Sequence, residues 1–149
     1  MACFTVPMAT AAVTVAVEKA LPEGAKANPF ATRLPWLNKM MLGGSAILAL
    51  EHVYHGEVVF KPPFLTAMTE GPEAVDAMLR EMATRGVAMT VVVFAAWWCM
   101  VEFARGAKGG LRQAFFSRLS HFGRVPSTLA LVAWGAALMF AVDILADVL

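Results

Sequence analysis

Apolar residues fall in four long runs along the chain, separated by polar segments that contain proline and glycine. Lys61-Pro62-Pro63 ends the second run, and Pro126 with Ser127 opens the fourth. Residues 66–85, before the third run, are more polar, and Pro72 stands at a favoured first-turn position of an amphipathic helix that continues into that run. The runs therefore predict helices over about residues 2–20, 35–60, 72–105 and 125–149.

The first apolar run, residues 1–17, differs from the other three in length. Seventeen residues of helix reach about 25 Å, which is just short of a bilayer core of about 30 Å. No Lys or Arg precedes the run, and the first charges, Glu18 and Lys19, follow it. A secretory signal has the opposite order, so we expect a retained segment that either spans the membrane or lies at its interface.

The composition indicates that much of the protein's surface is in contact with lipid and not with water. Hydrophobic residues make up 59% of the chain and charged residues 15%, whereas soluble domains have about 25% charged residues. A chain of 149 residues cannot bury so much apolar surface by itself. We therefore predict one all-α domain, residues 1–149, that is an integral membrane bundle of three to four transmembrane helices. The net charge of +1 argues against a nucleic-acid partner.

The distribution of positive charge predicts the orientation of the bundle. The segment 105–124 carries five basic residues and no acid, and the segment before the second helix is also basic. The segment 66–85 is acidic. We therefore expect segment 105–124 in the cytoplasm and the C-terminus outside, in the inner or plasma membrane of a bacterium or archaeon.

A cluster of acids and histidines, residues 51–57, interrupts the second apolar run near its end. If that helix enters the core near Met40, Glu51 lies about 16 Å deep. Glu51 and His55 share a helix face at i,i+4, and His52 is adjacent to His55 at i,i+3. Glu57 points away from Glu51 unless Gly56 breaks the helix, so we place it at the periphery of the site, where Lys61 is a possible partner.

The last helix carries acids at the same expected depth. Asp143 lies about 22 Å into that span, level with His55, and Asp147 follows one turn further out. Arg85 should lie at the outer mouth of the helix between, at the periphery. A charge inside the bilayer costs at least about 2.5–3.5 kcal/mol, so this polar layer requires an explanation. Its predicted members are Glu51, His52, His55, Asp143 and Asp147.

Three interpretations of the layer remain open. Glu51, either histidine and Asp143 would form a mixed nitrogen and oxygen donor set for a divalent metal ion: zinc, iron, manganese or nickel. The same groups would serve a proton or ion pathway in a transporter component. Alternatively, they hydrogen-bond across the bundle in a structural or assembly subunit of a larger complex. The leading expectation is a metal ion or an ionisable substrate bound in the outer half of the bilayer, with enzymatic activity left open.

Other features narrow these interpretations. The sequence EHxxH at Glu51 lacks the internal acid of the metalloprotease motif HEXXH. Haem is not expected, because His52 and His55 share one helix and His121 lies in the basic segment. Cys3 and Cys99 are expected to pack as small hydrophobes without a disulfide.

The small residues at 43–46 and 133–137 predict close packing between helices. So small a bundle should also form a homo-oligomer or join a larger complex.

Overall fold

The computed structural model describes residues 2–106 and 127–148, and these residues form helices and connecting turns with no strand. The predicted all-α bundle is therefore confirmed for this part of the chain. Short helical turns η1 (Glu23–Ala27), α2 (Pro29–Thr32) and α4 (Ala67–Glu70) join the longer elements. The longer helices are α1 (Thr5–Ala20), α3 (Leu34–Tyr54), α5 (Pro72–Glu81), α6 (Val87–Gly106) and α8 (Ser127–Val148), and a π-helical turn, η2 (Met82–Gly86), joins α5 to α6.

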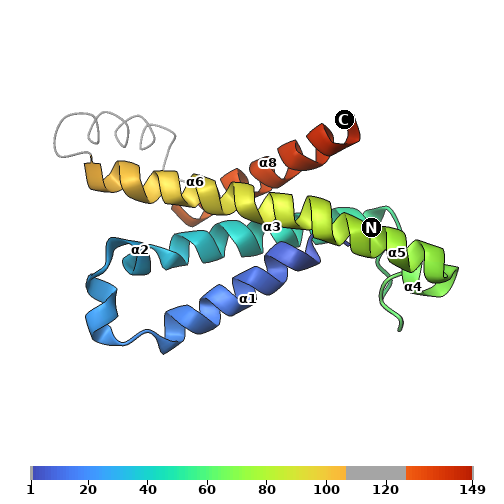
Figure 1. Cartoon of the computed structure of the whole chain (residues 1–149), viewed down its shortest axis with the longest axis horizontal. Helices are drawn as coiled ribbons and strands as arrows, with labels where there is room; N and C mark the ends of the chain where they lie inside the picture. Colours follow the sequence, from blue (N-terminus) through green and yellow to red (C-terminus); the bar gives the residue numbers. More distant parts are fainter. Residues whose placement is uncertain (1, 107–126, 149) are drawn as a thin grey trace.

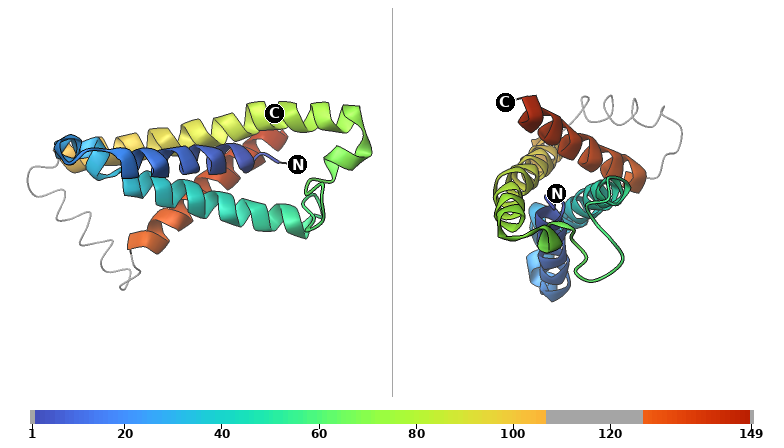
Figure 2. Two further views of the ribbon diagram at one scale, coloured as in Figure 1. Left: turned by 90° about the horizontal axis from the view of Figure 1, so that it is seen from below. Right: turned by 90° about the vertical axis from the view of Figure 1, so that its right-hand side faces the viewer.

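Helix α3 lies at the centre of the bundle, between α1 and α8 (Figure 1). Elements α5, η2 and α6 form one long continuous rod, and α8 crosses the bundle obliquely (Figure 2). The start of α1 and the ends of α3 and α8 lie toward the same end of the bundle, where α5 is found (Figures 1 and 2). This arrangement brings polar residues from three separate parts of the sequence to one end.

The contact between α3 and α8 depends on glycine. A Cβ atom added at Gly135 would lie 2.3 Å from the carbonyl oxygen of Met40, and one added at Gly44 would lie 2.7 Å from the sulfur of Met139. Small residues let two helix backbones approach this closely, as expected from the small residues in both segments. The interface therefore fixes α8, and with it Asp143, relative to α3.

A short polar chain connects α1 to α3. Thr14 Oγ1 donates to Asn38 Oδ1 at 2.6 Å, and Asn38 Nδ2 donates to the Glu18 carboxylate. Asn38 is buried, so these bonds satisfy a polar side chain that lies away from solvent. A separate hydrogen bond connects α6 to the start of α3, because Trp97 Nε1 donates to the carbonyl oxygen of Arg33 at 2.9 Å.

The predicted helix over residues 35–60 ends early, at Tyr54. Gly56 adopts a left-handed conformation with φ of +75°, which residues other than glycine rarely adopt. Its N–H donates to the carbonyl of Val53, and the N–H of Glu57 donates to the carbonyl of His52. These two bonds form a Schellman motif, which ends α3 and turns the chain back on itself. The expectation that the helix continues to Phe60 was therefore wrong.

Among residues 2–106 and 127–148, two helices are long and apolar enough to cross a membrane: the rod over Pro72–Arg105 and the segment Thr128–Ala146 of α8. Helix α1 has 16 residues, or about 24 Å. Helix α3 contains Asn38, Lys39 and Glu51, which lower its hydropathy. Membrane insertion is thus compatible with two described helices, and the third and fourth spans remain predictions.

Candidate functional site

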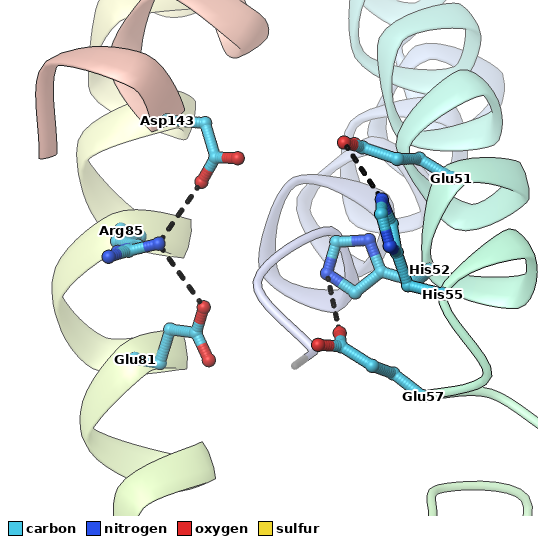
Figure 3. Close-up of a pocket in the computed structure, with 7 residues that line it drawn as sticks. All are labelled: Glu51, His52, His55, Glu57, Glu81, Arg85 and Asp143. Atoms are coloured by element: carbon cyan, nitrogen blue, oxygen red, sulfur yellow. Dashed lines mark hydrogen bonds and ion pairs between the residues drawn. The ribbon is translucent and has the colours of Figure 1, made fainter. Parts of the chain in front are cut away.

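A pocket of about 230 Å³ opens at the end of the bundle where α3 stops. Helix α3 and the turn after it supply one wall, and the α5–η2 segment with α8 supplies the opposite wall (Figure 3). Every residue that lines the pocket is ionisable. They are Glu51, His52, His55, Glu57, Glu81, Arg85 and Asp143.

His52 is the most buried of these side chains, with 7% of its surface exposed. Its Nδ1 lies 2.8 Å from the carbonyl oxygen of Leu48, one helical turn earlier. Because a carbonyl oxygen only accepts, Nδ1 carries the hydrogen of this bond. In neutral His52 the lone pair is therefore on Nε2. This atom lies 3.7 Å from Glu57 Oε2 and 3.6 Å from Cys3 Sγ.

Glu57 reaches His52 because α3 ends at Tyr54 and the chain turns at Gly56. The Schellman motif holds the Glu57 N–H against the end of α3, and Thr66 donates to the Glu57 carbonyl from both its N–H and its hydroxyl, each at 3.1 Å. The backbone of Glu57 is thus fixed on both sides. Glu57 lines the pocket opposite the α5–η2 segment, which agrees with the expectation that Glu57 points away from Glu51 unless Gly56 breaks the helix.

Glu51 and His55 lie on one face of α3, as their i,i+4 spacing predicts. Glu51 Oε1 lies 4.0 Å from His55 Nε2, and 59% of the His55 side chain is exposed. The other carboxylate oxygen, Glu51 Oε2, is buried and has no hydrogen-bond partner among the described residues. An unsatisfied buried acceptor costs about 1–3 kcal/mol, and a charged one costs more.

Arg85 lies between two carboxylates on the opposite wall (Figure 3). Its Nη1 is 3.6 Å from Glu81 Oε1 and 3.5 Å from Asp143 Oδ1, so it connects the rod to α8. Arg85 belongs to the π-helical turn η2, a geometry that is frequent at functional sites. The sequence places Arg85 at the periphery, whereas the structure places it within the pocket wall.

Glu81 is the lining residue that the sequence-based prediction missed. It belongs to the amphipathic end of α5, four residues before Arg85. Because the helix continues from α5 into η2, this spacing puts the Glu81 carboxylate beside the guanidinium. The i,i+4 spacing of Glu81 and Arg85 could be seen in the sequence, but it indicates a pocket wall only once Asp143 is known to face this pair.

The pocket carries a surplus of negative charge. Four carboxylates face the single guanidinium of Arg85, so the net formal charge of the lining residues is −3 with both histidines neutral and −1 with both protonated. A cation bound in this space would compensate part of that charge.

The donor atoms are divided between the two walls. Among residues 2–106 and 127–148, no three His, Cys, Asp or Glu side chains converge so as to hold a metal ion as they stand. Asp143 is engaged with Arg85, and Glu51 with His55, so the predicted set of Glu51, a histidine and Asp143 is not assembled. The side chain of Asp147 and the whole of His121 lie outside the described residues.

Comparison with known proteins adds no identification. The chain matches no protein-family model, no curated protein and no solved structure.

Proposed function

We propose that this protein is a membrane-embedded helical bundle that binds a cation in the Glu/His/Asp pocket, and that the cation is a divalent metal ion. The observation that carries this proposal is the excess of carboxylates over permanent cations in a pocket that also contains an unpartnered carboxylate oxygen, Glu51 Oε2. A bound divalent ion would compensate most of the negative charge and supply that oxygen with a partner.

The exposure of the two apolar helices supports a location in the membrane. Only 22% of the most apolar window of each helix is buried inside the bundle, whereas the core helix of a soluble protein is mostly buried. Leu129, Trp134 and Ile144 of α8 each leave more than half of their surface exposed. Such a surface is stable in lipid and costly in water, because apolar area exposed to water is unfavourable by about 25 cal/mol per Å².

The donor chemistry supports a transition metal such as zinc, iron, manganese or nickel. His52 donates its Nδ1 hydrogen to a backbone carbonyl, which is the arrangement that orients histidines whose Nε2 binds metal. Ligands at about 2.1 Å from a tetrahedral ion lie about 3.4 Å apart. The His52–Glu57 and His55–Glu51 atom pairs, at 3.7 and 4.0 Å, need to close by only a few tenths of an ångström.

The test is metal binding by the full chain in detergent. Purified protein is stripped of metal, and its affinity for Zn²⁺ and Mn²⁺ is measured by calorimetry. Glu51→Gln removes a charge and keeps the shape of the side chain, so we expect at least a tenfold loss of affinity for both ions. Glu70→Gln, on the exposed surface of α4, is the matched control and should leave the affinity unchanged. Folded wild-type protein that binds neither ion would overturn the proposal.

A structural role is the second candidate, and the ion pairs of Arg85 favour it. Arg85 joins the rod to α8 through Glu81 and Asp143, which is what a polar link between helices of a non-catalytic subunit requires. In that case Glu51→Gln and Asp143→Asn lower thermal stability, and no metal ion raises it. Proton or ion transport would instead appear as a pH-dependent flux in liposomes that Glu51→Gln abolishes in folded protein.

A further inference from the structure

A cysteine lies directly behind the pocket, next to His52. Cys3 precedes α1, and only 1% of its surface is exposed. Its Sγ lies 3.6 Å from His52 Nε2, although 49 residues separate the two in sequence. The sequence predicts only a small hydrophobe at this position, whereas the structure places the thiol in contact with an ionisable ring.

Packing fixes the backbone at Cys3. Gly86 of η2 approaches it so closely that an added Cβ atom would lie 2.8 Å from the Cys3 carbonyl oxygen. The next residue, Phe4, packs edge-to-face against the His52 ring, with 5.2 Å between the ring centroids. The thiol is therefore held between the rod and α3, on the same Nε2 atom that faces Glu57.

The separation of Cys3 Sγ and His52 Nε2 matches that of two ligands of one tetrahedral metal ion. With a zinc–sulfur bond of about 2.3 Å and a zinc–nitrogen bond of about 2.05 Å, two ligands of one ion lie about 3.6 Å apart. Cys3 Sγ and His52 Nε2 are already at this separation. Glu57 Oε2 lies 3.7 Å from the same nitrogen, against about 3.4 Å for a nitrogen and an oxygen ligand. No set of three ligands is assembled as the described residues stand, so the Glu57 side chain has to move toward the sulfur and the nitrogen when the ion binds.

A metal ion that binds cysteine binds it as the thiolate, so a divalent cation at this place would attract the Cys3 sulfur as well as the neighbouring carboxylates.

We propose that Cys3 joins His52 and Glu57 as a ligand of the metal ion, which makes the site selective for thiophilic ions such as Zn²⁺, Co²⁺ and Cd²⁺ over Mn²⁺. This inference rests on the proposed function, because it specifies which cation that site takes. On binding, the Cys3 S–H bond breaks, its proton leaves to solvent, and the sulfur lone pair forms the bond to the metal. The fourth coordination position faces the pocket.

Cobalt spectroscopy of the Cys99→Ser variant tests the ligand directly. The chain contains two cysteines, so this substitution at an exposed position leaves Cys3 as the one remaining thiol. We expect Co²⁺ added to the full-length variant, in detergent and thiol-free buffer, to produce a thiolate-to-cobalt charge-transfer band in the near ultraviolet. Zn²⁺ should displace the cobalt and remove the band.

The Cys3→Ser variant then measures selectivity. It should bind Zn²⁺ at least tenfold more weakly than wild type and bind Mn²⁺ with unchanged affinity. Cobalt bound to Cys99→Ser without a charge-transfer band would overturn the role of Cys3 and leave the proposed function intact. No binding of any ion to the folded wild-type chain would overturn both. The Cys99→Ser spectrum decides the question even if Cys3→Ser fails to fold.

Discussion

The substitution Gly135→Ala tests the contact that places α8 against α3. The added methyl carbon would lie 2.3 Å from the Met40 carbonyl oxygen and 2.8 Å from the carbonyl carbon. Both atoms belong to the backbone of a helix, so neither can rotate away as a side chain does. The two helices must instead separate. Because Asp143 lies eight residues further along α8, this movement also reaches the pocket.

The size of the effect follows from that clash. Real Cβ atoms essentially never approach within 3.0 Å, so the helices must separate by about 0.7 Å at this point. Overpacking by one methylene in a well-packed core costs about 1–3 kcal/mol. Because backbone atoms block the methyl group at Gly135, we expect the upper part of that range, about 2–3 kcal/mol of the free energy of unfolding.

The assay is reversible unfolding in mixed detergent micelles by SDS, followed by circular dichroism. Gly24→Ala is the control, because the same methyl group there meets nothing within 4 Å and should cost less than about 0.5 kcal/mol. The three atoms nearest to the methyl group of Gly43→Ala are side-chain atoms of Val132, the closest at 2.6 Å, so its cost should fall between the two. If Gly135→Ala unfolds like Gly24→Ala, the close packing of α3 on α8 is refuted.

Two further substitutions test the pocket walls. Gly56→Ala places an L side chain at a φ of +75° and should lower the free energy of unfolding by about 1 kcal/mol. Gly56→Asn should lower it by less, because asparagine tolerates this conformation better. Equal losses of stability in thermal unfolding would contradict a left-handed residue at this helix end. Arg85→Met removes the guanidinium shared by Glu81 and Asp143 and should lower stability by about 1–3 kcal/mol. Adding Asp143→Asn should recover part of that loss in a double-mutant cycle, and strictly additive effects would show that the two residues do not interact.

The sequence alone predicted the all-α class and the long helices, because these depend on local composition and on proline and glycine positions. It also predicted that Glu51 and His55 share a face, since a spacing of four residues follows from 3.6 residues per turn. Helix rise placed Asp143 level with His55, and the structure brings both residues to one pocket. These inferences needed only the geometry of a regular helix.

The geometry of a regular helix could not predict where α3 ends. Gly56 in a helical pattern is compatible both with a continuing helix and with a left-handed cap. Which of the two occurs depends on the turn that follows, in which Thr66 bonds to the Glu57 carbonyl. A continuing helix turns Glu57 away from the site, whereas the observed cap turns it toward His52.

Only the tertiary structure decided which residues face one another across the pocket. Arg85 contacts Asp143 because α8 crosses the rod at this level. Cys3 contacts His52, and Gly86 allows the chain before α1 to approach η2 closely. Such contacts cannot be predicted from the local periodicity of the sequence. They result from the crossing angles and close approaches of whole helices, which are set by the sum of many packing interactions along each helix.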